Sequence, residues 1–350
     1  MYTLPERDLE EVLVAGEDSF AALRGARVFV TGGTGFVGSW LIESLLWANR
    51  RLALGVRLLV LTRDPAGVAT RFAQAAQAGC LALVEGDVRT FDLDERVDAV
   101  VNAATPRAGR AHDPGELVDT NVAGARNVVR FAARSGAIPV LFTSSGAVYG
   151  PQPPELERIP EEYAGAPDQL DPRYAYHEAK RVAELLHVAE GRRSGIQVKI
   201  ARLFAFVGPY LPLDAHFAIG NFIRDAHHGG PIAVDGDGTP VRSYLYASDM
   251  TAWLWRILAA GQPERAYNVG SEQPVSIVET ARAVAAAAGL PAESVQVRVA
   301  STPDGPRERY VPDTARARSQ LGLRQTVDLN SAIVRTLQYS SGRERGRDEA

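Results

Sequence analysis

The sequence predicts an α/β protein with a doubly wound parallel sheet and a smaller C-terminal lobe. Up to about residue 205, short runs of aliphatic and aromatic residues alternate with segments of helical apolar spacing. Such alternation is typical of βαβ units, in which helices cover both faces of a parallel sheet. Beyond that point prolines and glycines interrupt the alternation, and mixed short elements follow.

The expected strands are short apolar runs bounded by polar or turn residues, at 28–31, 56–62, 81–87, 99–104, 139–143 and 198–202. Helical spacing predicts helices from residue 39 onward, over about 115–134 and over about 173–190. Ligands of such sheets bind beyond the carboxyl ends of the strands. We therefore expect one crevice to collect the residues that follow the strands: Gly32, Arg63, Asp87, Ala103, Ser145 and Phe204.

The chain divides into four expected segments. Residues 1–24 form an N-terminal helical extension, because acids alternate with Leu, Val and Phe there. Residues 25–205 form the sheet domain, and 206–340 form a mixed α/β lobe that binds the substrate. Residues 341–350 are charged and lack apolar anchors, which indicates a flexible tail.

Composition narrows the function classes. The 350 residues are 46% hydrophobic with a net charge of -4 and no basic stripe, so we expect no nucleic-acid partner. A single cysteine predicts neither a disulfide framework nor a thiolate metal cluster, and we expect no metal site. The charged N-terminus is unlike a signal peptide, and no apolar run is long enough to span a bilayer. We therefore expect a cytoplasmic protein with no membrane partner.

A glycine-rich turn after the first strand predicts a Rossmann-type dinucleotide site. Residues 31–38 read Thr-Gly-Gly-Thr-Gly-Phe-Val-Gly and lead into a helix. The first glycine permits the tight turn, Gly35 lets the backbone approach a pyrophosphate, and Gly38 lets helix and strand pack closely. The N–H groups at the helix start then face the phosphates. The expected cofactor contacts of this turn are Gly32, Thr34, Gly35, Phe36 and Val37.

The end of the second strand favours NADP as the cofactor. NAD binders usually place an acid there against the ribose hydroxyls, but this sequence has Thr62 followed by Arg63. A guanidinium can grip the 2′-phosphate of NADP. In the alternative, Arg63 is solvated and Asp64 turns to the ribose, which would keep NAD.

Tyr176 and Lys180 are the expected catalytic residues, together with Ser145. The spacing i, i+4 puts Tyr176 and Lys180 on one helix face. A phenol has a pKa near 10, and a nearby ammonium lowers it by favouring the phenolate. Lys180 can also bond the nicotinamide ribose, and Ser145 can bond the substrate oxygen that Tyr176 serves. The three residues predict hydride transfer at a carbinol or ketone carbon, with Tyr176 moving the proton.

These motifs carry a family resemblance. The glycine-rich turn, the run Ser145-Gly-Ala-Val-Tyr-Gly and Tyr176-x-x-x-Lys180 resemble the extended short-chain dehydrogenase/reductases. The run from Gly236 to Asp249 and the run Tyr267-Asn-Val-Gly-Ser are similar to the nucleotide-sugar epimerase/dehydratase branch. The resemblance extends over residues 25–338 and does not specify a substrate.

The resemblance implies further site residues and a nucleoside-diphosphate sugar as the substrate. Those implied at the cofactor are Asp87 and Val88 for the adenine, and Ala103 and Ala104 along its length. Those implied at the sugar nucleotide are Asn221, Arg242 and Arg309, besides Ser145. Ordinary surface arginines are the alternative for Arg242 and Arg309.

The residues after Ser145 indicate which reactions of the resembling family this sequence favours. In the resembling 4,6-dehydratases the matching residue is a Thr followed by Asp and Glu, and nucleotide-glucuronate decarboxylases keep the Glu. Here those places are Gly146 and Ala147, so the acid and base that elimination of water needs are missing. We therefore expect an oxidoreductase at C4 of the sugar: a 4-ketoreductase using NADPH, or alternatively a 4-epimerase with resident NAD. A 4,6-dehydratase or a non-catalytic dinucleotide-binding protein ranks behind both.

The two long helices of the sheet domain also predict a homodimer. Members of the resembling family commonly pair these helices across a two-fold axis, and two-fold dimers are the commonest oligomers. Apolar positions exceed what one core face needs: Val122, Val128, Val129, Val182, Leu185 and Leu186.

Overall fold

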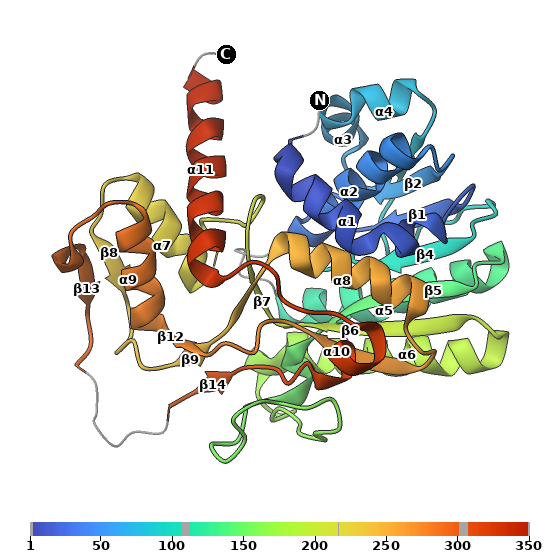
Figure 1. Cartoon of the computed structure of the whole chain (residues 1–350). Helices are drawn as coiled ribbons and strands as arrows, with labels where there is room; N and C mark the ends of the chain where they lie inside the picture. Colours follow the sequence, from blue (N-terminus) through green and yellow to red (C-terminus); the bar gives the residue numbers. More distant parts are fainter. Residues whose placement is uncertain (1–2, 107–112, 216, 301–306, 349–350) are drawn as a thin grey trace.

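A seven-stranded parallel sheet forms the larger part of the molecule (Figure 1). The computed structural model describes residues 3–106, 113–215, 217–300 and 307–348. The strand order is β11-β6-β5-β4-β1-β2-β3, and all neighbours run parallel. The strands are β1 Arg27–Thr31, β2 Arg57–Thr62, β3 Leu81–Glu85, β4 Ala99–Asn102, β5 Pro139–Ser145, β6 Gln197–Leu203 and β11 Arg265–Val269. The order reverses at β1, so the expected doubly wound Rossmann-type sheet is confirmed.

Alternate residues of each strand enter two separate cores, as the two-residue period of a strand requires. Val28 and Val30 of β1 face one core, and Phe29 faces the other. The first core is covered by α1 Glu6–Ala21, α2 Phe36–Leu52, α3 Pro65–Arg71, α4 Ala73–Gln77 and α8 Ala247–Ala260. The second core is covered by α5 Pro114–Ser135 and α6 Ala175–Ser194.

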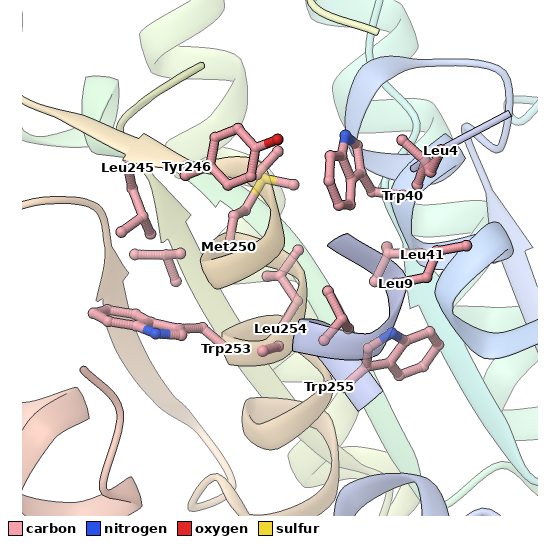
Figure 2. Packing of buried hydrophobic residues seen from close by; sticks show 14 of the residues in the cluster. Leu4, Leu9, Trp40, Leu41, Leu245, Tyr246, Met250, Trp253, Leu254 and Trp255 are labelled. Atoms are coloured by element: carbon pink, nitrogen blue, oxygen red, sulfur yellow. The ribbon is translucent and has the colours of Figure 1, made fainter. Parts of the chain in front are cut away.

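The first core binds the N-terminal helix firmly to the sheet domain. Leu9 of α1 lies beside Leu254 and Trp255 of α8, and Trp40 of α2 lies beside Tyr246 (Figure 2). The indole of Trp255 donates a hydrogen bond of 2.9 Å to the Ser44 hydroxyl. The helix expected near the N-terminus is therefore present and packed, because burial of its apolar face stabilises it.

Charged groups add a second anchor for α1. The buried Asp8 carboxylate accepts hydrogen bonds from Tyr246 at 2.7 Å and from Arg335 at 3.0 Å. Arg335 lies on α11 Leu329–Asp348, the helix that stands away from the body in Figure 1. Burial raises the pKa of Asp8 although both partners oppose it. The Asp8 carboxylate thus joins α1, near the start of the described chain, to α11, at its end.

The smaller C-terminal lobe contains short sheets and helices. Its strand pairs are β7 Ala205–Val207 with β10 Tyr244–Tyr246, and β8 Ile232–Val234 with β13 Val295–Val297. A third sheet has the order β12 Val275–Ser276, β9 Val241–Arg242, β14 Arg309–Tyr310. The helices are α7 Ala218–His227, α9 Ile277–Ala287, α10 Ala315–Leu321 and α11.

Two features differ from the segments expected from sequence. Strand β11 and helix α8 belong to residues 206–340, yet both pack in the large sheet domain. The segment expected as a flexible tail continues α11 as far as Asp348. Arg and Glu are good helix formers, and no proline interrupts this segment.

The helix face expected to pair in a dimer is only partly free. Val128 and Val129 are buried in the second core of the same chain. Val118, Val182 and Leu185 remain 38%, 39% and 67% exposed. Among the described helices, none is both long and apolar enough to cross a membrane.

Candidate functional site

The turn between β1 and α2 has a geometry that only glycine permits. Gly32 has a φ of 70°, and a Cβ there would collide with the carbonyl oxygen of Ala103, which follows β4. A Cβ on Gly38 would collide with the carbonyl oxygen of Gly32. The turn is therefore pressed against both the neighbouring strand and its own helix, as a dinucleotide-binding turn requires.

The start of α2 fits the pyrophosphate of a dinucleotide. The helix begins at Phe36, and no side chain caps it at Gly35. The first N–H groups of a helix have no intrahelical partner, so these groups remain available to an anion. Thr34 and Gly35 are exposed beside them, and Phe36 and Val37 are half-buried. All five turn residues expected to contact the cofactor lie at this one end of the sheet.

After β2, Arg63 is exposed to solvent, whereas the neighbouring Asp64 is engaged in a helix cap. The Asp64 carboxylate accepts a hydrogen bond of 3.0 Å from the Gly67 N–H and so caps α3. The Asp87 carboxylate is held by Arg89 at 2.8 and 2.9 Å. This bonding holds the pKa of Asp87 below its ordinary value, and the charge of Arg63 contributes to the lowering. The positive charges of Arg63 and Arg89 thus flank the expected adenosine end.

Hydrogen bonds fix the remaining cofactor loops. The Thr31 hydroxyl donates to the Asn102 side chain at 2.8 Å and accepts from the Ala104 N–H at 3.2 Å. These bonds tie the end of β1 to the loop that carries Ala103 and Ala104. Asn127 of α5 donates to the carbonyl oxygen of Val88 at 3.2 Å, which holds the loop after β3.

Ser145, Tyr176 and Lys180 lie together at the carboxyl end of β5. Ser145 is the last residue of β5 and is 8% exposed, and Tyr176 lies in the first turn of α6. The Ser145 hydroxyl also accepts a hydrogen bond of 3.1 Å from the Ala147 N–H. Lys180 lies one turn further along α6 and donates to the Thr143 carbonyl oxygen at 3.1 Å.

Burial dominates the electrostatics of this cluster. It raises the pKa of Tyr176, and the Ser145 hydroxyl opposes the rise. Burial lowers the pKa of Lys180 to about 8. The lowering of the Tyr176 pKa expected from Lys180 is not found, because the ammonium lies 5.8 Å from the ring centroid and bonds a carbonyl oxygen instead.

Tyr310 of β14 is a site residue that the sequence did not indicate. Its ring centroid lies 4.6 Å from that of Phe204. Its hydroxyl oxygen lies 2.5 Å from the place that a Cβ on Gly146 would take. Burial raises the pKa of Tyr310 well above its ordinary value. The sequence did offer one signal. Arg309 was expected at the site, and its neighbour Tyr310 on the same strand faces the opposite side, so either of the two could have been the residue that faces the site.

The residues expected at the sugar nucleotide are spread over the small lobe. Arg242 of β9 is paired with Tyr310 in the strand register and forms a 2.6 Å ion pair with Glu308. Arg309 instead donates to the Glu157 carbonyl oxygen at 3.3 Å. Asn221 of α7 lines a separate cavity of about 570 Å³ within the lobe. Of the three, only Arg242 is linked here to the Ser145 cluster.

The carboxylates nearest in sequence to this cluster are engaged in other contacts. Glu184 of α6 forms an ion pair of 2.7 Å with Arg202 and accepts a 2.6 Å hydrogen bond from Ser144. Glu178 lies 3.6 Å from Arg181. In the described part of the chain, no three histidine, cysteine or carboxylate side chains gather where they could hold a metal ion. His216 lies outside the described residues.

Comparison with known proteins decides the family. The sequence model of the NAD-dependent epimerase/dehydratase family matches residues 28–270. The chain belongs to this family. UDP-glucuronic acid decarboxylase 5 of Arabidopsis thaliana is a relative, 32% identical over 310 residues, which are 88% of this chain and 87% of that protein. The resemblance drawn from the motifs is confirmed.

Solved structures agree with this assignment. The structure is similar to that of dTDP-glucose 4,6-dehydratase from Streptomyces venezuelae with NAD bound, with a TM-score of 0.76 and 26% identity over 92% of this chain and 98% of that one. UDP-glucuronic acid 4-epimerase from Bacillus cereus, in complex with NAD, has the same fold at a TM-score of 0.76 and 21% identity, over 91% and 98% of the two chains. These similar proteins are named for different reactions.

Proposed function

We propose that this protein is an NADPH-dependent 4-ketoreductase of a nucleoside-diphosphate sugar. The observation that carries the proposal is the cluster of hydroxyl groups beside the glycine-rich turn. Ser145 ends β5 and Tyr176 lies in the first turn of α6, and the turn 146–149 that follows Ser145 contains no carboxylate. This set of groups can exchange a proton with an oxygen but offers no carboxylate to remove a proton from carbon.

Each residue has a defined task in the reduction. The nicotinamide, when bound, supplies the hydride that reduces the C4 carbonyl carbon. Tyr176 gives its hydroxyl proton to the C4 oxygen, and Ser145 donates a hydrogen bond to the same oxygen. Lys180, whose ammonium donates to the Thr143 carbonyl oxygen, is the proposed contact for the nicotinamide ribose. Arg242 is the proposed contact for the diphosphate of the substrate.

The absence of a carboxylate after Ser145 argues against the reactions named for several relatives. A 4,6-dehydratase needs an acid and a base at C5 and C6, and the glucuronate decarboxylases that this sequence resembles keep one Glu in the turn. Gly146 and Ala147 supply neither. Glu184, a carboxylate near the cluster, is held by Arg202 and Ser144, so it is not free to replace them.

The surroundings of Arg63 support NADP as the cofactor. Asp64 is the one acid directly after β2, and its carboxylate caps α3. The exposed guanidinium of Arg63 therefore remains as the group best suited to the adenosine ribose, where it favours a 2′-phosphate. The solved relatives described above bind NAD, and NAD is the alternative cofactor.

One assay separates the reactions that these residues could serve. The purified protein is incubated with a nucleoside-diphosphate 4-ketohexose and NADPH or NADH, and cofactor absorbance and product mass are followed together. A reductase consumes one cofactor for each product. A 4-epimerase interconverts the C4 epimers of a nucleotide sugar without net cofactor loss, and that result would replace the ketoreductase by the epimerase. Conversion of UDP-glucuronic acid to a pentose nucleotide would refute both.

A further inference from the structure

A fully buried histidine lies on the helix that carries the expected catalytic residues, and the proposed reaction does not use it. His187 of α6 follows Lys180 by seven residues, which is about two helical turns, so both lie on one face of the helix. Its ring stacks on that of Phe142 of β5, with the centroids 4.2 Å apart. The two ring nitrogens face the Ala183 carbonyl oxygen at 2.8 Å and the Asn102 side-chain amide at 3.4 Å. His187 thus connects α6 with the end of β4.

The Ala183 carbonyl oxygen determines which ring nitrogen carries the proton. A carbonyl oxygen can only accept a hydrogen bond, so Nδ1 of His187 must be the N–H that donates to it. Burial lowers the pKa of His187 to about 4, and the charge of Lys180 acts in the same direction. The ring is therefore neutral at about pH 7, and Nε2 has no proton. This Nε2 can only accept, and the Asn102 amide nitrogen donates to it.

The orientation of the Asn102 amide then sets the direction of the hydrogen bonds beyond it. With its nitrogen toward His187, its oxygen Oδ1 faces Thr31 and accepts from the Thr31 hydroxyl at 2.8 Å. A hydroxyl has one proton, so the Thr31 oxygen is left as an acceptor, and it accepts from the Ala104 N–H at 3.2 Å. With the amide turned over, its oxygen would face the unprotonated Nε2, and two acceptors would oppose each other.

Asn102 is also tied to the strand that binds Lys180. The Thr143 hydroxyl donates to the Asn102 carbonyl oxygen at 3.1 Å, and the Thr143 carbonyl oxygen accepts from the Lys180 ammonium at 3.1 Å. Asn102 is buried, and a buried polar atom without a partner is costly. The chain of hydrogen bonds from His187 through Asn102 to Thr31 therefore has one low-energy arrangement, and it joins α6 to the loop after β4.

We propose that His187 is a positioning residue for the dinucleotide cofactor. As a neutral acceptor it holds the Asn102 amide in one orientation, and through Thr31 it fixes the loop after β4. The expected cofactor contacts Ala103 and Ala104 lie in this loop. His187 acts through the two residues between it and the loop. The inference rests on the proposed function only in placing the cofactor beside this loop, and it does not depend on the sugar.

The tautomer of His187 is tested first, without any ligand. Nitrogen-15 NMR of histidine-labelled protein distinguishes the Nδ1–H tautomer, the Nε2–H tautomer and the imidazolium by their ring-nitrogen shifts. With the signals of His187 assigned by their loss in His187→Gln, we expect the neutral Nδ1–H form at about pH 7. An Nε2–H tautomer or an imidazolium would overturn the proposal, because Nε2 would then be a donor that faces the Asn102 amide nitrogen.

Two substitutions at His187 separate hydrogen bonding from packing. In His187→Gln the side-chain oxygen can replace Nε2 as the acceptor, whereas His187→Leu fills the space and accepts nothing. We expect His187→Leu to raise the Kd of NADPH and of NADH by about three- to tenfold, the effect of one net hydrogen bond. His187→Gln should stay within about twofold of the wild type. Packing alone predicts the opposite order, because leucine suits the contact with Phe142 better. Weaker or equal binding by His187→Gln would overturn the proposal.

Thr31→Val tests the other end of the same chain of hydrogen bonds, and it does not depend on whether His187→Leu folds. It removes the hydroxyl that accepts from the Ala104 N–H, so the Kd of both cofactors should rise by about the same factor. Adding His187→Leu should raise the Kd little further, because both changes break one chain. Fully additive effects would refute the shared cause.

Thr251→Val is the matched control for Thr31→Val. Thr251 is equally buried, and its hydroxyl donates within its own helix α8, to the Ala247 carbonyl oxygen at 2.7 Å. The substitution removes the same group away from the loop after β4, so we expect the Kd of both cofactors to stay unchanged. A rise as large as that in Thr31→Val would show that loss of any buried hydroxyl weakens the cofactor site, and it would contradict the specific role of the chain.

The same binding data separate this inference from the proposed function. Arg63→Ala should change NADPH binding relative to NADH binding, whereas His187→Leu should weaken both equally, because β1 lies between β4 and the strand that precedes Arg63. A protein with the expected His187 effects that reduces no nucleotide 4-ketosugar would refute the ketoreductase alone. An active reductase in which His187→Leu binds both cofactors like the wild type would refute only the role of His187.

Discussion

Replacing Arg63 by alanine should weaken NADPH binding far more than NADH binding. Arg63 is exposed after β2, and the neighbouring Asp64 carboxylate is used to cap α3. A hydrogen bond to a charged group contributes about 1.5–3 kcal/mol, and solvent screening at an exposed site reduces this to about 1–2 kcal/mol. With tenfold in affinity for each 1.4 kcal/mol, NADPH should bind about 5- to 30-fold more weakly. NADH lacks the 2′-phosphate and should change less than about twofold.

Titration calorimetry with both cofactors measures this difference, and Arg57→Ala is the matched control. Arg57 is also exposed and lies at the opposite end of the same strand, about 20 Å away at the rise of a β-strand. The substitution Arg57→Ala removes the same charge without changing the adenosine end of the expected cofactor site. The loss of NADPH affinity relative to NADH affinity in Arg63→Ala should also become smaller at high salt. Equal weakening of NADPH and NADH would refute the argument for NADP and return a 4-epimerase with NAD to first place.

Three further outcomes are expected. Tyr176→Phe should abolish most turnover while thermal unfolding and cofactor binding stay unchanged, and near-wild-type turnover would contradict its role as the proton donor. The wild-type chain should form a dimer in light scattering through the exposed Val118, Val182 and Leu185, and Leu185→Glu should shift it toward monomers; a wild-type monomer at micromolar concentration would refute the pairing. Incubation with a nucleotide glucose and cofactor should give no 4-keto-6-deoxy product by mass, and steady loss of water would mean that a carboxylate outside the turn performs the elimination.

Local patterns sufficed to predict the sheet and the residues that lie together at the end of β5 and the start of α6. The turn at Gly32 and Gly38 and the pair Tyr176 and Lys180 depend on residues a few positions apart, and strand ends of a parallel sheet meet at one edge. The helix spacing did not reveal the direction of the Lys180 ammonium, which bonds a carbonyl oxygen of β5. The expected effect on the Tyr176 pKa failed for that reason.

Contacts between distant segments could not be predicted in the same way. The Tyr310 hydroxyl lies beside Gly146 because β14 pairs with β9, and no local pattern specifies that pairing. The resemblance directed attention to Arg309, its neighbour on the opposite side of the strand. The capping role of Asp64 was open to prediction, because Asp followed by Pro is a common helix start.

The placement of β11 at the edge of the large sheet affects how the sheet can assemble during synthesis of the chain. Strand β6 ends at Leu203, and its partner β11 begins only at Arg265. The ribosome adds on the order of 5–20 residues each second, so β6 waits roughly 3–12 s for its neighbour. During that time its backbone N–H and C=O groups form an open edge that other chains can join. Slower synthesis should therefore increase aggregation of the nascent chain, and a chaperone that covers this strand should reduce it.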